Sequence, residues 1–299
     1  MSLAPDPAYE SREHRRRRFR RHRRRAYIRS VYFLPSAATL GNAICGFGAM
    51  YVASLKPEHF SRDPLTNWFS HYNFVVAAYL IFAAMLFDAL DGRLARFTRH
   101  TTDFGGQLDS LADVLSFGAA PAFLALEVFK SFYPEAPPAI SRLIWAIGAL
   151  YMSCAAMRLA RFNVSNEHGE QHHFSFLGLP SPGAGAAVAA FILMQQHLFN
   201  EGAANRLFAS LSTLCIWLLP AVVLSTGLLM VSDIRYPHIV NRYLRGRRSL
   251  GRLLAFVIGA LLLVVAHQIT LALGSLLYAF SGLGWFLYRM LRKKPPTPS

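Results

Sequence analysis

Long apolar runs recur along this chain and are separated by short polar or charged segments. A helix needs about 20 apolar residues to cross the hydrocarbon core of a bilayer, so each run predicts one membrane-spanning helix. The pattern therefore predicts an all-α integral membrane protein of about eight transmembrane helices. The two C-terminal spans are separated only by His267 and Gln268. The predicted spans are Val31–Leu55, Phe74–Phe97, Gly105–Phe129, Leu143–Phe162, Leu179–Phe199, Leu207–Val231, Leu250–His267 and Thr270–Met290.

The charged residues lie mostly between these spans and predict how the chain is oriented. Only 16% of the residues are charged, yet the net charge is +15, with 31 lysines and arginines. If the N-terminus is cytoplasmic, the great majority of these basic residues fall on the cytoplasmic side, as the positive-inside rule requires. An even number of spans returns the C-terminus to that side. We expect a multi-pass protein with both termini in the cytoplasm.

An arginine-rich segment precedes the first span and divides the chain into three predicted parts. Residues 1–30 form a basic, disordered cytoplasmic tail, 31–245 a membrane domain, and 246–299 two further spans with a short basic end. The tail lacks the interleaved aromatic residues that stack on nucleic-acid bases. Anionic membrane lipids are therefore the predicted partner of the tail, and nucleic acid is not.

Four aspartates stand at the ends of two predicted spans, in the pattern D-x2-D-G-x2-A-R-x8-G-x3-D-x3-D from Asp88 to Asp113. Carboxylates in such apolar surroundings are costly unless a metal or a partner neutralises them. Asp88 and Asp91 are spaced i, i+3, and Asp109 and Asp113 are spaced i, i+4, so each pair shares one helix face. Two facing helices would bring all four carboxylates to one point, which we place at the cytoplasmic membrane face.

Carboxylates without neighbouring histidine or cysteine favour hard cations, so we expect Mg²⁺ or Mn²⁺ rather than zinc. Four negative charges can neutralise two divalent ions, and two-metal sites act on phosphate esters and pyrophosphates. The alternative is a set of structural salt bridges with Arg93, Arg96 and Arg99. Acidic residues inside membranes are functional by default, which favours the metal site.

These motifs resemble the CDP-alcohol phosphatidyltransferase family, whose signature the segment Asp88–Asp113 matches at every position. Further segments are similar to the phosphatidylserine synthase branch of that family. Together the similar segments span roughly residues 30–240. The further segments are P-S-A-A-T-L-G-N-A-I-C-G (Pro35–Gly46), M-R-L-A-R-F-N-V (Met157–Val164), G-L-P-S-P (Gly178–Pro182) and M-V-S-D-I-R-Y-P (Met230–Pro237).

The resemblance implies transfer of a phosphatidyl group from CDP-diacylglycerol to L-serine, giving phosphatidylserine and CMP. It implies that all four aspartates bind the metals and that Asp113 is also the general base. The CDP-lipid site that it implies contains Gly92, Ala95, Arg96, Gly105, Thr39 and Asn42.

The acceptor site is predicted near the end of the fourth span. A serine carboxylate suits the two-donor fork of an arginine, and Arg158 and Arg161 are spaced i, i+3 there, with Asn163 adding a donor and an acceptor. Alternatively, both arginines only anchor the helix at lipid headgroups. Glycerol 3-phosphate or an inositol phosphate are alternative acceptors that would need a denser cationic cluster.

Two alternatives concern the protein as a whole. A non-catalytic membrane scaffold could recruit anionic partners through the arginine tail, although an intact set of metal ligands argues against it. Small residues cluster around Gly41–Gly48 and in Leu177–Ala187, where they allow helices to pack closely. Packing within the chain is the predicted role of these residues, and a homodimer interface is the alternative.

Overall fold

The computed structural model describes residues 37–55, 72–98, 103–167, 177–202, 205–234, 236 and 261–292. The arginine-rich tail and most of the predicted span Leu250–His267 lie outside these residues, as do the side chains of Ala95 and Arg96. The described part of the chain is helical, which confirms the predicted fold class. After an unlabelled helix at 37–54, the helices are α3 (Asn73–Thr98), α4 (Asp103–Asp113), the π-helix η2 (Val114–Ala119), α5 (Ala120–Phe132), α6 (Pro138–Glu167), α7 (Ser181–Gly202), α8 (Arg206–Val231) and α11 (His267–Arg292).

Five helical segments in the described part of the chain are long and apolar enough to cross a membrane. They correspond to the second, third, fourth, sixth and eighth predicted spans, while the helix at 37–54 and α7 occupy the first and fifth. The third predicted span consists of α4, η2 and α5, which follow one another without a break. The sequence predicts it as a plain transmembrane helix. The five segments are Asn73–Leu94, Phe104–Phe132, Pro138–Val164, Arg206–Val231 and His267–Phe286.

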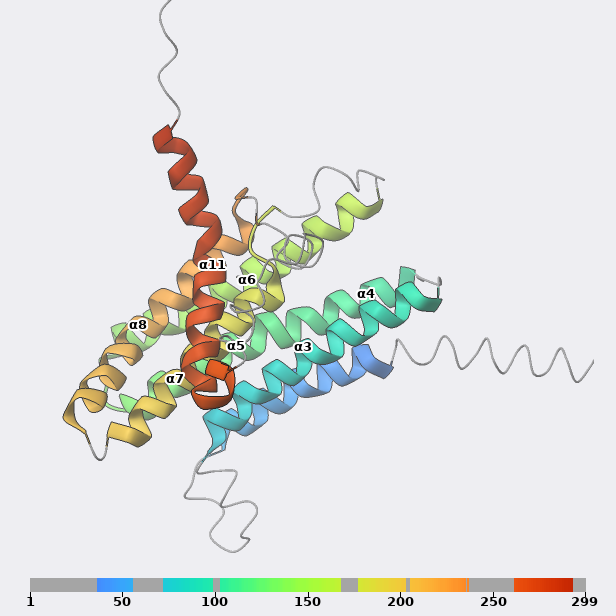
Figure 1. Cartoon of the computed structure of the whole chain (residues 1–299). Coiled ribbons are helices and arrows are strands. Elements are labelled where there is room, and N and C mark those ends of the chain that lie inside the picture. The colour runs from blue at the N-terminus through green and yellow to red at the C-terminus, as the bar shows by residue number, and fades with distance from the viewer. Residues whose placement is uncertain are drawn as a thin grey trace, which may run out of the picture.

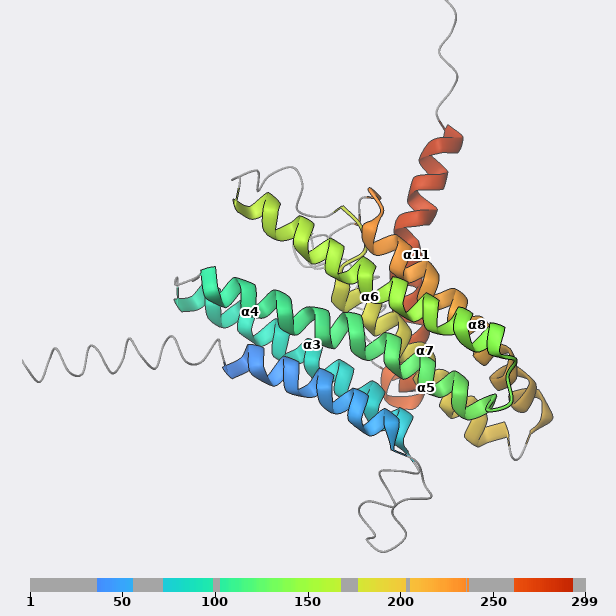
Figure 2. The ribbon, with the colours of Figure 1, turned by 180° about the vertical axis from the view of Figure 1, so that it is seen from behind.

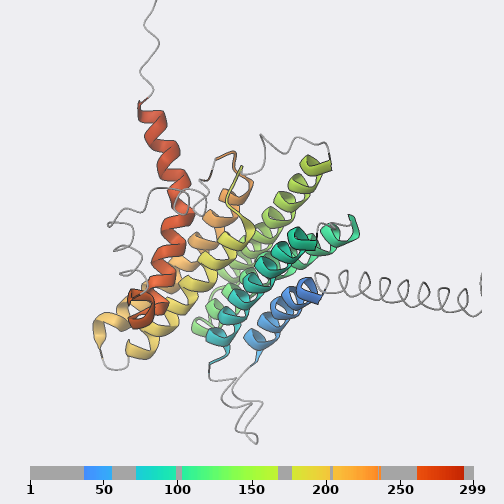
Figure 3. The same ribbon diagram turned by 45° about the vertical axis from the view of Figure 1, so that its right-hand side comes forward.

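The helix at 37–54, α3, the α4–α5 segment and α6 run side by side, as the view from behind shows (Figure 2). Helix α11 stands at a steep angle to this group (Figures 1 and 3). Helix α7 occupies the middle of the bundle, in contact with α3, α5, α8 and α11. Its alanines and Gly185 are buried, which confirms that the small residues of this segment pack helices together within one chain.

Gly178 ties the connection before α7 to the end of α8. Its φ is +82°, a left-handed conformation that favours glycine. Its N–H donates to the carbonyl of Ile234 at 2.9 Å, and an added Cβ would collide with the carbonyl oxygen of Met230. Glycine is therefore required there, which explains the first position of the G-L-P-S-P motif.

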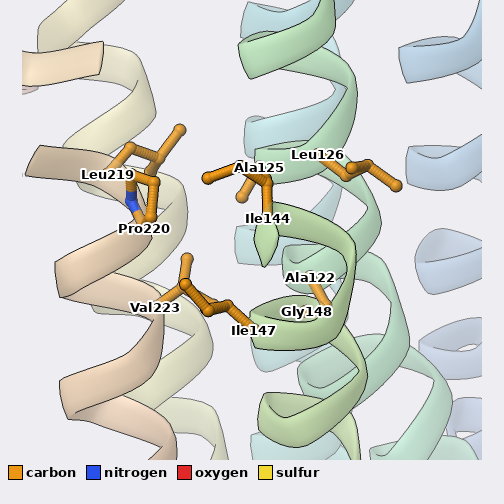
Figure 4. Close-up of a pocket in the computed structure, with 9 residues that line it drawn as sticks. All are labelled: Ala122, Ala125, Leu126, Ile144, Ile147, Gly148, Leu219, Pro220 and Val223. Atoms are coloured by element: carbon orange, nitrogen blue, oxygen red, sulfur yellow. The ribbon is translucent and has the colours of Figure 1, made fainter. Parts of the chain in front are cut away.

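Pro220 lies inside α8, as predicted, and borders a small gap between α5, α6 and α8 (Figure 4). A proline inside a helix removes one backbone donor, and its ring clashes with the carbonyl four residues earlier. All side chains lining the gap are apolar or glycine, so it offers no chemistry and belongs to the packed interior.

Candidate functional site

The aspartates of the signature converge as their spacing predicts. Helix α3 carries Asp88 and Asp91, and α4 carries Asp109 and Asp113. One carboxylate oxygen each from Asp88, Asp91 and Asp109 lie within 4.8 Å of one another. Asp113 follows Asp109 by one helical turn and interacts electrostatically with the other three.

These three carboxylates fit a divalent cation. The Oδ1 atom of Asp109 is buried and has no hydrogen-bond partner among the described residues. Such an oxygen is costly to bury unless something positive reaches it. Only carboxylate oxygens make up the convergent group, and oxygen ligands suit Mg²⁺ or Mn²⁺. The residues present therefore fit the predicted kind of metal.

The helix at 37–54 supplies hydrogen-bond donors to two of the aspartates. Thr39 donates from Oγ1 to Oδ2 of Asp91 at 2.9 Å, and Asn42 donates from Nδ2 to Oδ1 of Asp113 at 3.0 Å. Both donors are almost completely buried. Both hydrogen bonds thus reach carboxylates of the aspartate group, whereas a role of Thr39 and Asn42 in binding the CDP-lipid stays a prediction.

Ser116 orients the amide of Asn42, a role that the sequence alone did not suggest. Its Oγ lies 2.6 Å from Oδ1 of Asn42 and 2.6 Å from the carbonyl oxygen of Ala112. A hydroxyl donating to Oδ1 leaves Nδ2 directed at Asp113. Gly46 permits this contact, because an added Cβ would lie 2.7 Å from the Cα of Ser116. The i, i+3 spacing between Asp113 and Ser116 was the feature of the sequence that could have suggested this role.

The π-helix η2 begins directly after Asp113, and Pro121 explains why. In a regular α-helix the N–H of residue 121 would bond to the carbonyl of Phe117, but proline has no N–H. The chain instead forms wider turns, in which Ala120 N–H bonds to the carbonyl of Leu115. The hydroxyl of buried Tyr151, on α6, donates to the Phe117 carbonyl at 3.0 Å.

Tyr151→Phe is expected to lower both the unfolding temperature and the turnover number. Losing the donor leaves a buried carbonyl poorly satisfied, at a cost of about 1–3 kcal/mol. It also frees the turn that follows Asp113, so a general base at that position would be held less well. Thermal unfolding and CMP release measure the two effects. The control is Tyr51→Phe, at a side chain that is 57% exposed. Unchanged stability would show that the hydroxyl does not support η2.

The three predicted acceptor residues point to different partners. Arg158 donates from an Nη atom to Ser181 Oγ at 2.8 Å, while Arg161 pairs with Asp233 at 2.9 Å on the exposed surface. Asn163 donates to Ser110, next to Asp109, at 2.9 Å. The Nε atom of Arg158 is buried and has no hydrogen-bond partner among the described residues. Arg158 therefore faces the interior, and an exposed pair such as that of Arg161 contributes little to stability.

The glycines predicted to border the CDP-lipid lie beside the aspartates. Gly92 follows Asp91 and is exposed, and among the described residues no neighbouring helix or side chain lies within 4 Å of where its Cβ would be. Gly105 is half-buried in the first turn of α4. Open space next to Asp91 agrees with a bulky group approaching the backbone there.

Comparison with known proteins gives consistent matches. The family model for CDP-alcohol phosphatidyltransferase matches residues 32–225. A CDP-diacylglycerol–serine O-phosphatidyltransferase of Helicobacter pylori is 34% identical over 212 residues, which are 71% of this chain and 74% of the relative. A CDP-diacylglycerol–serine O-phosphatidyltransferase of Methanocaldococcus jannaschii is 37% identical over a segment that covers 54% of this chain and 64% of the relative. An archaetidylserine synthase of Methanothermobacter thermautotrophicus is 33% identical over a segment that covers 54% of this chain and 58% of the relative. The chain belongs to the CDP-alcohol phosphatidyltransferase family.

Proposed function

We propose that this protein transfers the phosphatidyl group of CDP-diacylglycerol to L-serine, giving phosphatidylserine and CMP. The observation that carries the proposal is the convergence of Asp88, Asp91 and Asp109 beside Asp113, on helices that are apolar enough to cross a membrane. The names of the relatives supply the acceptor, because two of the three compared proteins are serine O-phosphatidyltransferases.

Asp88, Asp91, Asp109 and Asp113 are the residues that would hold two Mg²⁺ or Mn²⁺ ions. When bound, such ions neutralise the diphosphate of the CDP-lipid and stabilise the charge that develops on the leaving CMP. The buried Oδ1 of Asp109, which has no hydrogen-bond partner in the described part of the chain, supports this assignment. Thr39 orients the Asp91 carboxylate through its hydrogen bond and thereby keeps the ligand set in place.

Asp113 acts as the general base. It takes the proton of the serine hydroxyl, whose oxygen then bonds to the phosphorus that carries the diacylglycerol. The bond from that phosphorus to the oxygen of CMP breaks, and CMP leaves with the electron pair. The proton passes from Asp113 to water. Asn42, oriented by Ser116, keeps one Asp113 oxygen occupied and so directs the other toward the substrate.

The remaining parts of the proposal concern placement. We place the aspartates and both termini on the cytoplasmic side, because the positive-inside rule predicts that orientation. A site at the membrane surface lets the acyl chains of the substrate stay in the bilayer.

Residues 31–245 carry the chemistry, and the basic tail at 1–30 binds anionic lipids. The homodimer stays an untested alternative.

Arg158→Lys is expected to raise the KM for L-serine about ten-fold or more, because lysine keeps the charge but loses the planar fork that binds a carboxylate. Arg161→Lys should have a much smaller effect, since Arg161 is exposed and already paired with Asp233. The KM for CDP-diacylglycerol should change little in both. Arg142→Lys, at the other end of α6, is the matched control. Equal effects on both substrates would point to phosphate binding or helix placement.

One assay tests the proposed reaction directly. Purified protein is given CDP-diacylglycerol, Mg²⁺ or Mn²⁺, and either L-serine, glycerol 3-phosphate or an inositol phosphate, and the lipid products are identified by mass. We expect phosphatidylserine with L-serine and no lipid product from the other acceptors. A lipid product from glycerol 3-phosphate or from an inositol phosphate, with none from L-serine, would identify that alcohol as the acceptor in place of serine. No CMP release with any acceptor would favour the scaffold alternative.

A further inference from the structure

Helix α11 lies beyond the residues matched by the family model and nevertheless packs next to the predicted acceptor site. The match ends at residue 225, and α11 begins at His267. The helix contacts α7, and its Ala272 and Ala279 are completely buried. Figure 1 shows α11 crossing in front of α7. A helix in this position can supply side chains to the site that the family match does not include.

Tyr278 of α11 and Arg158 of α6 reach the same turn of α7. Arg158 donates to the hydroxyl of Ser181, the first residue of α7, which is completely buried. Two residues later, a Cβ added to Gly183 would lie 3.0 Å from Cε1 of Tyr278. The absence of a side chain at Gly183 thus lets the Tyr278 ring lie against the α7 backbone. The two side chains meet α7 within one turn of each other.

Tyr236 makes a second contact with the Tyr278 ring. Tyr236 packs against it edge to face, with ring centroids 6.0 Å apart, and donates from its hydroxyl to the carbonyl of Ala279 at 2.7 Å. Tyr236 is 6% exposed. Tyr278 is therefore clamped by contacts with both α7 and Tyr236, which leave its ring little freedom to turn.

Arg158 has donor capacity left for a partner. One Nη atom bonds to Ser181, while Nε is buried without a hydrogen-bond partner among the described residues. Its guanidinium interacts electrostatically with both Asp113 and Tyr278. The phenol oxygen of Tyr278 can accept from a guanidinium, and such a contact restricts the rotation of a long, flexible side chain.

We propose that Tyr278 is a positioning residue for the acceptor: clamped against α7, it holds the Arg158 guanidinium in the orientation that binds the carboxylate of L-serine. Through Tyr278, α11 sets the affinity of the enzyme for its acceptor. The inference rests on the proposed function, because it takes Arg158 as the group that binds the carboxylate.

Tyr278→Phe in the full-length protein tests the idea, because it removes one oxygen and keeps the ring that packs on Gly183. The KM for L-serine should rise about five-fold, with kcat and the KM for CDP-diacylglycerol within about two-fold of the original. A merely structural role would lower kcat or change both KM values together. Leu277→Ala, at a neighbouring side chain that is 72% exposed, is the control and should change neither KM.

A double variant decides whether Tyr278 acts through Arg158. If it does, Tyr278→Phe should add no further increase in the serine KM once Arg158→Lys is present. Tyr236→Phe, which loosens the clamp, should give a smaller increase in the same direction. An unchanged serine KM in Tyr278→Phe, or effects of Tyr278→Phe and Arg158→Lys that multiply, would overturn the inference. The proposed reaction would survive either result, because it fails only if the unmodified protein makes no phosphatidylserine.

Discussion

Asp109→Asn should abolish CMP release to within background, a loss of about 10³-fold or more, equivalent to about 4 kcal/mol of transition-state stabilisation. The reason is the placement of Asp109. Its Oδ1 is buried without a hydrogen-bond partner among the described residues, and its carboxylate converges with those of Asp88 and Asp91. Asparagine has the same size but removes one negative charge from a group that must hold divalent cations.

A second readout separates this loss from misfolding. Binding of a metal to the native protein raises the unfolding temperature, so added Mg²⁺ or Mn²⁺ should stabilise the original protein more than Asp109→Asn. With a chelator present, the variant should be at least as stable as the original, because three carboxylates without a cation repel one another. Glu135→Gln, an exposed acidic residue between α5 and α6, is the control. Turnover that survives exhaustive chelation would rule out the metal site.

Asp113→Asn is expected to lower the turnover number by about 10²–10⁴-fold, the usual contribution of a positioned general base. The introduced amide keeps a carbonyl oxygen that can accept the hydrogen bond from Asn42, so we expect the local structure to persist. Binding of CDP-diacylglycerol should fall much less than turnover. Steady-state CMP release and direct binding of the nucleotide-lipid measure the two quantities.

The outcome also distinguishes the two roles assigned to Asp113. A loss of lipid binding as large as the loss of turnover would make the residue a metal ligand rather than a base. Ser116→Ala is the graded comparison, since it removes the hydroxyl that orients Asn42 and leaves every carboxylate in place. Its turnover should fall less than that of Asp113→Asn. A near-normal turnover number in Asp113→Asn would remove the residue from proton transfer.

Local periodicity was enough to predict that the aspartates converge. Residues three or four positions apart share a helix face wherever the helix lies, so Asp88 with Asp91, and Asp109 with Asp113, could be paired without knowing the fold. Apolar runs likewise identified the membrane-spanning segments, because their length is set by the bilayer. The spans Asn73–Leu94 and Arg206–Val231 agree with the predicted positions to within a few residues.

The same local reasoning was insufficient for the predicted acceptor group. Arg158 and Arg161 are three residues apart and were equal candidates for binding the serine carboxylate, but one donates to the buried hydroxyl of Ser181 and the other pairs with exposed Asp233. Long side chains spread to partners on neighbouring elements, and the spacing along one helix does not identify those elements. The sequence therefore could not separate an interior arginine from one at the surface.

By itself, then, the sequence determined the helical membrane fold and the pairing of the four aspartates, which follow from composition, hydrophobic length and spacing within single helices, and its motifs indicated the family by resemblance. Only the tertiary structure decided what supports them. The bonds from Thr39 to Asp91 and from Asn42 to Asp113 join residues 52 and 71 positions apart. The contact of Tyr151 with the π-helix, and that of Tyr278 with α7, also join separate helices. Such contacts depend on how helices pack, which no periodicity along one segment encodes.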